Sequence, residues 1–305
     1  MINWDFLEHF ILLKCRIFFD VYYTPKRILL TTTSLVLAAG VAQADVSFSG
    51  MGEVSYAKAG AADDLALRTG YDLNIALSGS SDNGITYSMG TDIGGGNTID
   101  RNDDFAIDDQ NMGETTPTMT IGYGGLTITA KQDGLDDLYS DSQNGDVGIS
   151  GSMGGLSFAV VAETSDDATS TSFSLGGAAG GLTWGFVSTD DNGSGAAAQK
   201  VTLGYTVSDS LSASFKYDTK GDADAITTVG IKNVMGAITV GLSADDNDDW
   251  DASVAYTAGA LTASIATDED SAWEVVSEYD LGGGATAFLT TTESEFTALG
   301  MSFAF

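Results

Sequence analysis

The fold is decided by the last eleven residues of the chain, Glu295–Phe305 (EFTALGMSFAF). Large apolar side chains occupy every second position from Leu299 to Phe305, and small residues occupy the positions between them. A repeat of two over this length predicts a β-strand with two unlike faces. We expect a sheet to hold this strand, because a terminus is normally disordered unless other structure ties it down.

The same alternation runs through the chain from Asp45 onward, interrupted at short intervals by Gly, Asp, Asn and Ser. The chain has 38 Gly and only 2 Pro, and its apolar residues are spread out, which is typical of many short strands joined by turns. After residue 44 no run approaches the roughly 20 apolar residues that a membrane helix needs. We count 18 strands; one misread hairpin would make 16, and the least regular segments are 94–117 and 118–131.

Residues 1–44 have a different character. Lys26 and Arg27 precede an apolar run that ends in the small-residue motif at 42–44, which is the pattern of a cleaved secretory signal peptide. We therefore predict a mature chain that begins at Asp45 and forms one domain, 45–305. Residues 1–25 do not fit this plan: we interpret them as a gene-start error or a cloned extension, and the alternative is a long signal peptide removed whole.

Charge and residue usage exclude several classes of function. The chain carries 43 acidic and 12 basic side chains, and residues 45–305 alone have a net charge of −32, so nucleic acid and anionic membrane surfaces are poor partners. The single His and the single Cys, His9 and Cys15, both precede Asp45. The predicted mature chain thus has no Cys nucleophile, no His base and no His or Cys metal ligand, and we predict that it is not an enzyme.

Charged residues in the predicted strands keep to the face opposite the apolar residues. A soluble β-sandwich would also segregate them, but Tyr and Trp recur near strand ends on the apolar face, as in membrane-interface girdles. A run of 261 residues without a linker is also long for a sandwich. We predict an all-β fold, a transmembrane antiparallel β-barrel of 16–18 strands. The charged residues expected to line its lumen are Glu53, Arg68, Asp72, Lys131, Glu163, Lys216, Asp218, Lys232, Asp251, Glu274 and Glu278.

Connections alternate between short, glycine-rich turns and longer, acid-rich loops. Antiparallel strands send alternate connections to opposite ends, so tight turns should collect at one end and acidic loops at the other, as in outer-membrane barrels. To close such a barrel, the terminal strand should pair antiparallel with residues 45–58.

The leader, the predicted mature start Asp45–Gly50 (DVSFSG), the turn Tyr279–Gly284 (YDLGGG) and the terminal Phe305 together resemble the porins of Rhodobacter-type alphaproteobacteria. The resemblance implies export through the periplasm, the barrel-assembly machinery as a partner, and a homotrimer in the outer membrane that contacts lipid and lipopolysaccharide. It also implies that Phe305 is an assembly signal, whose deletion should impair assembly.

Porins of that family have 16 strands, admit small hydrophilic solutes passively, and fold their third outer loop into the lumen as a constriction. In this chain the third outer loop is 132–145, which is short for that role, and 94–117 is an alternative plug. The predicted constriction combines acids of this loop with basic residues of lumen parity, and their opposition would favour polar solutes. The alternative is that these charges only solvate the pore wall. The residues are Asp133, Asp136, Asp137, Asp141, Arg68, Lys131, Lys216 and Lys232.

The net charge predicts a preference for cations. An acidic loop offers candidate Ca²⁺ ligands at Asp245, Asp246, Asp248 and Asp249, although its spacing matches no EF-hand and a solvated loop is the simpler interpretation. We predict no other cofactor. The alternative functions are a substrate-specific channel, an adhesin barrel, or a secreted acidic Ca²⁺-binding β-protein, which would need tandem Gly/Asp repeats where this chain has one isolated fragment at 94–97.

Overall fold

The computed structural model describes residues 44–101, 104–110, 116–140, 143–164, 170–191, 195–221 and 223–305. The predicted extension and signal peptide, except for Ala44, lie outside these residues, as does Asp141. The regular elements of the described part are all β-strands. No helix within that part is long and apolar enough to cross a membrane.

The strands follow one another with short connections. Their bounds are β1 Ala44–Lys58, β2 Ala66–Ser80, β3 Thr86–Ile99, β4 Ile107–Asp109, β5 Thr118–Tyr123, β6 Leu126–Asp136, β7 Asn144–Met153, β8 Leu156–Ala162, β9 Thr171–Ala179, β10 Leu182–Thr189, β11 Ala198–Thr206, β12 Leu211–Asp218, β13 Ile226–Met235, β14 Ile238–Asp245, β15 Trp250–Ala258, β16 Leu261–Asp268, β17 Trp273–Gly282, β18 Ala285–Thr292 and β19 Thr297–Ala304.

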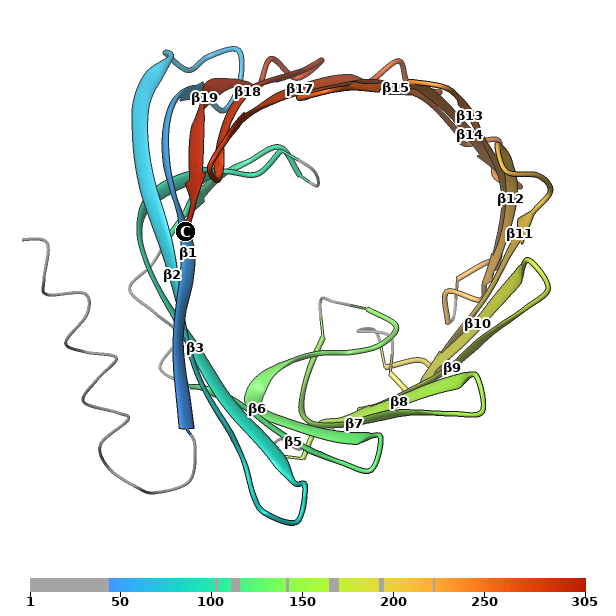
Figure 1. Ribbon diagram of the computed structural model, residues 1–305. Helices are drawn as coiled ribbons and strands as arrows, with labels where there is room; N and C mark the ends of the chain where they lie inside the picture. The colour runs from blue at the N-terminus through green and yellow to red at the C-terminus, as the bar shows by residue number, and fades with distance from the viewer. Residues whose placement is uncertain are drawn as a thin grey trace, which may run out of the picture. The chain divides into compact units, whose positions relative to one another are not determined.

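Eighteen of these strands form the wall of a closed antiparallel barrel, and β4 pairs with the end of β3. Each wall strand pairs with the next one along the chain, β3 pairing with β5, and β19 returns to pair with β1 (Figure 1). The predicted fold class is therefore confirmed, and the count agrees with the 18 segments of the sequence pattern.

The seam that closes the barrel joins the first wall strand to the last. In β1 and β19 the register runs from Met51 opposite Ala304 to Lys58 opposite Thr297, as expected for the terminal strand. Beyond it, the backbone N–H groups of Gly50 and Phe305 each donate to the other residue's carbonyl oxygen, both at 3.0 Å. Phe305 thus belongs to the seam; its role as an assembly signal stays a prediction.

The tight turns lie together at one end of the barrel. Gly124 and Gly125, between β5 and β6, have φ values of 60° and 86°, a left-handed conformation that suits a two-residue hairpin and that residues with a Cβ adopt poorly. Gly154 and Gly155 repeat this turn between β7 and β8. The glycine pairs of the sequence therefore mark the short-turn end as predicted.

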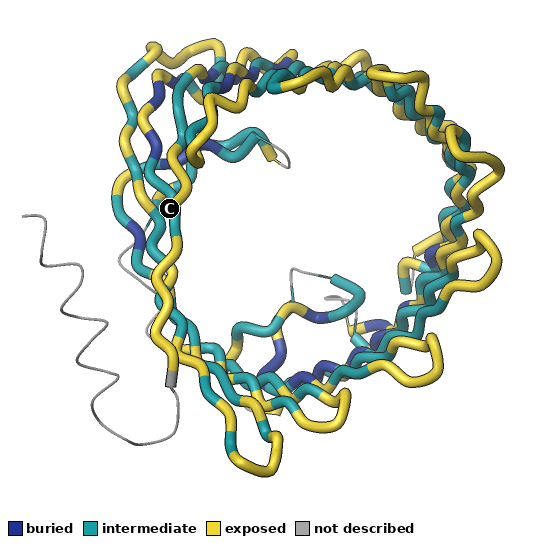
Figure 2. The backbone as a smooth tube through the Cα atoms, viewed as in Figure 1, coloured by how far each residue is buried: buried dark blue, intermediate teal, exposed yellow. Residues whose placement is uncertain are grey.

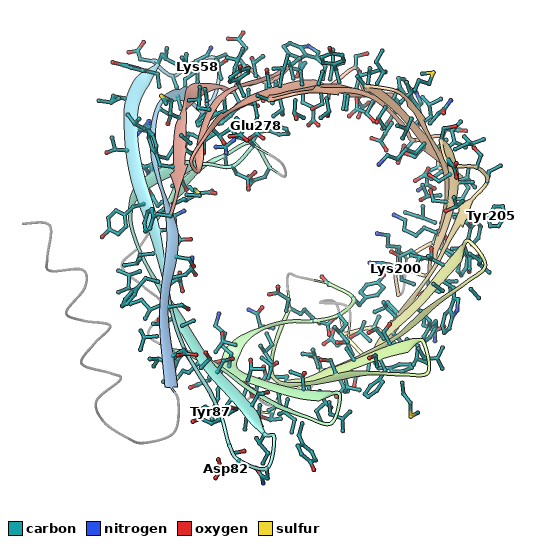
Figure 3. The ribbon with its side chains drawn as sticks, in the orientation of Figure 1. Lys58, Asp82, Tyr87, Lys200, Tyr205 and Glu278 are labelled. Carbon is teal, nitrogen blue, oxygen red and sulfur yellow. The ribbon has the colours of Figure 1, made fainter. Side chains whose placement is uncertain are left out.

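The two faces of the wall differ as the alternation predicts. On β11, Lys200 points into the barrel and Tyr205 points away from it (Figure 3). Large apolar residues remain exposed on the outside at mid-strand positions, including Ile231 at 52% and Ile265 at 50%. A water-soluble protein would normally bury such residues in its interior, so the outer surface of this barrel is suited to lipid.

Two strands extend further than the alternation indicates. β3 continues through Gly94 to Ile99, and β6 continues to Asp136, inside tracts expected to be irregular. Both extensions lead into segments within the barrel, where no lipid face imposes a repeat of two. Figure 2 shows buried stretches where these inner segments meet the wall.

Candidate functional site

The first inner segment is a short hairpin made by the end of β3 and by β4 (Figure 1). We call residues 96–101 and 104–110 the inner hairpin. Asn97 pairs with Asp109 and Ile99 with Ile107, and the N–H of Gln110 donates to the Gly96 carbonyl at 2.8 Å. These bonds give the hairpin a defined backbone of its own.

The inner hairpin packs on the inward face of β1, β18 and β19. Ile99, Phe105 and Ile107 contact a small apolar cluster on that wall, and the Phe105 and Phe296 rings meet edge to face with centroids 6.4 Å apart. The wall residues of the cluster are Ala57, Phe288, Phe296 and Ala298. The barrel therefore contains a local hydrophobic core, which buries the small face of the terminal strand at Ala298.

Arg101 attaches this hairpin to the wall by charge. Its Nη1 lies 3.0 Å from Oε2 of Glu53 on β1, and its Nε lies 3.1 Å from Oε1 of Glu278 on β17. The guanidinium also lies over the Phe288 ring, 4.1 Å from its centroid. A planar guanidinium with several donors is well suited to bridging two carboxylates over an aromatic face.

The second inner segment is the loop between β6 and β7. We call residues 137–140, with Gln143, the inner loop. The Tyr139 hydroxyl donates to Asp218 of β12, and Lys200 of β11 donates to the Tyr139 carbonyl at 3.2 Å, with its Nζ 4.7 Å from the ring centroid. Because five strands separate β6 from β12 in the wall, this loop must reach inward from one side of the barrel to another part of its wall.

Tyr139 is well placed to act as a neutral donor. Burial, and then the hydrogen bond to Asp218 and its negative charge, raise the pKa of Tyr139 to about 12. The phenol therefore keeps its proton throughout the neutral range, and the tether to β12 persists there.

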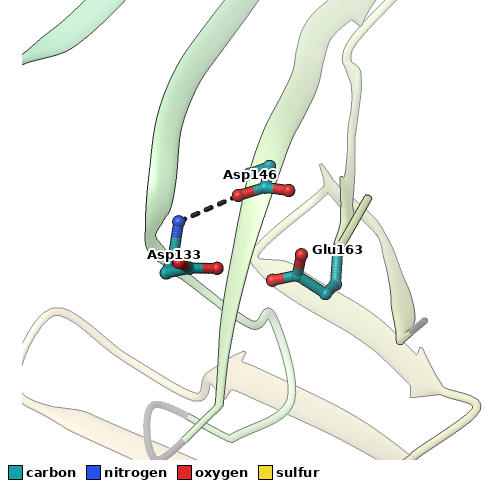
Figure 4. Close-up of side chains that lie close together, drawn as sticks. All are labelled: Asp133, Asp146 and Glu163. Carbon is teal, nitrogen blue, oxygen red and sulfur yellow. Dashed lines mark hydrogen bonds between the residues drawn. The ribbon is translucent and has the colours of Figure 1, made fainter. Parts of the chain in front are cut away.

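Three acidic residues lie together at the base of the inner loop (Figure 4). One carboxylate oxygen of Asp146 accepts from the N–H of Asp133 at 2.8 Å, and the other accepts from the N–H and hydroxyl of Thr164 at 3.0 and 2.7 Å. Asp133 has φ of 48° where the β6–β7 register shifts, so a bulge held by Asp146 turns β6 into the lumen.

Glu163 completes this group. Oxygens of Asp133, Asp146 and Glu163 lie within 4.8 Å of one another, and no other acidic, His or Cys triad does so among the described residues. Carboxylate oxygens are the ligands that Ca²⁺ prefers. Asp146 already accepts three bonds from protein donors, and these bonds give the group a role in shaping the loop.

Lysines gather in one sector of the inward face, which also carries Asp218. Three adjacent strands, β11 to β13, each carry one lysine, whereas β15 and β17 carry acids. The residues are Lys200, Lys216 and Lys232 in one sector of the wall and Asp251, Glu274 and Glu278 in the next. A cavity of about 290 Å³ lies between the tip of the inner hairpin and this acidic wall, lined by Asp104, Asp251, Asp268, Glu274 and Trp273 among others.

A barrel wall with inward-folded segments and charged residues on its inward face is the arrangement of a membrane channel. The family model described as Gram-negative porin matches residues 31–299. The chain belongs to the Gram-negative porin family. Family and fold agree with the predicted resemblance and point to an outer-membrane channel, not an enzyme.

Solved structures support this porin fold. One triple mutant of Rh. blastica porin is 17% identical, with a TM-score of 0.51, and the match covers 86% of this chain and 100% of that chain. A second, a triple mutant of Rhodopseudomonas blastica porin, is 14% identical with a TM-score of 0.52 and the same coverage. At such identity the likeness concerns the fold alone. No curated protein matches this chain.

The predicted constriction acids take different places in this porin. Asp137 is buried and caps the inner loop, its carboxylate accepting from the N–H groups of Tyr139 at 2.7 Å and Ser140 at 3.1 Å. Asp133 and Asp136 are exposed, and Asp141 lies outside the described residues. Asp137 shapes the loop and Asp133 joins Asp146 and Glu163, and a constriction role for Asp133, Asp136, Asp137 and Asp141 stays a prediction.

The predicted basic residues stand on the wall of the porin. Lys216 and Lys232 are exposed, and neither forms an ion pair with any residue that the structure describes. Arg68 and Lys131 are half-buried, and the Arg68 Nε has no hydrogen-bond partner in the described part of the chain. Their place in a constriction stays a prediction.

The acidic loop at 245–249 is organised by its own backbone. The Asp245 carboxylate accepts from the N–H groups of Asn247 and Asp249, and Asp246 accepts from the N–H of Thr227 at 2.9 Å. That bond lowers the pKa of Asp246, whereas desolvation and then repulsion by Asp245 raise the pKa of Asp249. Ca²⁺ binding by Asp245, Asp246, Asp248 and Asp249 stays a prediction.

Sequence reasoning missed Arg101, Tyr139, Lys200 and Asp146. Arg101 had a signal, because it is the sole basic residue of the acidic segment 94–117, which also holds Phe105 and Ile107. An isolated cation beside apolar residues in an acidic loop indicates a segment that packs against acids elsewhere. Tyr139 has no comparable signal, since its partner depends on how far the loop reaches.

Proposed function

We propose that this porin is a general diffusion channel that admits small hydrophilic solutes and ions and prefers cations. The observation that carries this proposal is the inner loop: Tyr139, which follows β6, bonds to Asp218 of β12 and so holds polar chain inside the barrel. The inner hairpin lies against a different part of the wall, at β1 and β17. Solutes pass between the two segments, which together set the bore.

Selectivity in this proposal arises from charge. Residues 45–305 carry a net charge of −32, and Asp104 of the inner hairpin lies near the acids of β15 to β17. In a narrow lumen with protein walls, such charges attract counter-ions more strongly than they would in bulk water. The lysines of β11 to β13 lie beside this acidic sector, with β14 between them, and the neighbouring charges of opposite sign create a field along the wall that favours polar over apolar solutes.

A salt gradient across a planar bilayer tests the proposal. We expect ohmic channels whose reversal potential has the sign of cation selectivity, and we expect the double variant Lys216→Glu, Lys232→Glu to increase that selectivity. Both lysines are exposed and unpaired among the described residues, so reversing their charge should leave the wall intact. Anion selectivity of the unaltered protein would contradict the cation preference, and a barrel that never conducts would contradict the channel.

Assembly and location form part of the same proposal. The protein is exported through the periplasm, inserted by the barrel-assembly machinery, and forms a homotrimer that contacts lipid and lipopolysaccharide. The exposed apolar outer face supports a lipid environment. A substrate-specific channel remains the alternative function, and single-channel recording separates the two, since a specific channel would saturate with its substrate and a general one would conduct in proportion to salt.

Removing the Tyr139 hydroxyl is expected to loosen the inner loop. In Tyr139→Phe the ring stays beside Lys200, but the buried Asp218 loses a donor, and a hydrogen bond to a charged group contributes about 1.5–3 kcal/mol. We expect noisier channels with altered conductance. Tyr205→Phe on β11 is the matched control, because that side chain points away from the barrel (Figure 3), and its conductance should equal that of the unaltered protein. Identical traces from both variants would show that the tether does not shape the path.

A further inference from the structure

We propose that Arg101 is the positioning residue that sets the size limit of the channel, because it holds the inner hairpin against the wall. This inference rests on the proposed function as a diffusion channel. It concerns the inner hairpin, which is distinct from the inner loop. Arg101 acts by holding the hairpin through its charge and not by contacting the solute.

The first step is the geometry of attachment. Glu53 and Glu278 belong to β1 and β17, which β18 and β19 separate in the wall. Arg101 spans this distance by bonding both carboxylates while its guanidinium covers Phe288 of β18. The Glu53 side chain is fully buried and that of Arg101 is only 14% exposed. One side chain therefore ties the hairpin to three strands.

The second step is what the hairpin covers. Oε1 of Glu53, whose other oxygen bonds Arg101, is buried and has no hydrogen-bond partner among the described residues. A buried polar atom without a partner opposes the state that buries it, and water in an open lumen would satisfy this oxygen. Covering this part of the wall thus has a polar cost, which the Arg101 bonds and the contacts of Phe105 and Ile107 offset.

The third step is the consequence for the bore. The inner hairpin lies against β1 and β17 to β19, and the inner loop bonds to β9, β11 and β12, so the two segments occupy different sectors of the lumen (Figure 1). Loss of the Arg101 bonds should leave the hairpin held by its apolar contacts alone. We expect it to leave the wall part of the time, and the lumen to admit larger solutes.

The test uses the double variant Arg101→Gln, Glu53→Gln, which removes both charges and so leaves no buried unpaired carboxylate at Glu53. We expect a single-channel conductance about two-fold above that of the unaltered protein and passage of larger neutral sugars in liposome swelling, because a wider lumen is less restrictive. Lys58→Gln is the control. It removes an ion pair of similar length, in which Lys58 Nζ lies 3.2 Å from Glu295 Oε2, and neither of these residues belongs to the inner hairpin. Such an exposed pair contributes little, and this variant should match the unaltered protein.

A second measurement does not depend on conduction. Phe105→Cys and Phe296→Cys, combined, place thiols on the hairpin and the wall, and the only native cysteine, Cys15, precedes the barrel domain. A short linker with two thiol-reactive ends should join them quickly when Arg101 is present and several-fold more slowly in the double variant. It should also return the conductance of that variant toward the unaltered value.

The outcomes separate the two proposals. If the unaltered protein fails to conduct, the proposed function falls, and the cross-linking rate alone decides whether Arg101 holds the hairpin. If the double variant matches the unaltered protein in conductance and cross-linking, the channel stands and the role of Arg101 is overturned.

Discussion

Replacing Gly300 by valine is expected to prevent the barrel from closing. Gly300 lies in the seam opposite Ser55, and a Cβ on it would lie 2.5 Å from the Val54 carbonyl oxygen, 2.6 Å from the Ser55 Cβ and 2.8 Å from the Phe288 ring. Two of these neighbours are parts of β1 that cannot move without breaking the seam. Overpacking a dense site costs about 1–3 kcal/mol, and a clash with backbone should reach or exceed the upper end.

The matched control is Gly52→Val on β1, the strand that pairs with β19 in the seam. A Cβ at Gly52 meets nothing closer than the Gly70 carbonyl oxygen at 4.0 Å, so the added side chain has space. Folding into lipid vesicles, followed by the gel mobility of unheated samples, measures the folded fraction. We expect Gly52→Val to fold like the unaltered protein and Gly300→Val to stay largely unfolded. Equal yields would mean that Gly300 does not face the seam as described.

The wall was predictable because each strand separates two environments. Lipid outside and water or protein inside impose a repeat of two, so Leu299, Ile231 and Tyr205 could be assigned to the outer face from parity alone. The pairing of the terminal strand with residues 45–58 followed from the need to close the sheet. Register could not be predicted, since a shift by two residues keeps every side chain on its face.

The inner segments could not be predicted in the same way. The end of β3 and all of β4 pair through their backbones inside the barrel, where neither face meets lipid, and so their sequence lacks alternation. The third outer loop, 132–145, is short for a constriction by its sequence alone. It still reaches the wall at β12, because β6 runs on to Asp136 and the bulge at Asp133 turns it inward.

Site residues on regular strands could also be predicted from the sequence, and those on the inner segments could not. Parity placed Lys216 and Lys232 on the lumen face, because a residue on a regular strand has only two directions available. The partners of Arg101 are 48 and 177 residues away along the chain. Such ion pairs depend on the position of a loop in the folded barrel. A short-range sequence pattern does not determine that position.

Placing a charge on the outer face is expected to destabilise the folded barrel strongly. Ile265 lies in the middle of β16, is half exposed, and pairs with Val254 and Val275 on its neighbours. If this surface meets lipid, Ile265→Arg should lower the free energy of unfolding in vesicles by about 2–4 kcal/mol, the cost measured for a basic side chain near the bilayer midplane. Urea titration of the vesicle-inserted protein measures the change.

Ser264→Arg is the control, because the preceding residue on β16 shares the parity of Ala266, which lines the cavity beside the inner hairpin. An arginine there can reach water in the lumen, so we expect the barrel to fold normally and its cation preference to fall. The pair of variants tests orientation directly, since the two positions are adjacent and receive the same side chain. A soluble barrel would tolerate Ile265→Arg, and a wall with its faces reversed would be destabilised by Ser264→Arg, so either result would remove the basis for a membrane channel.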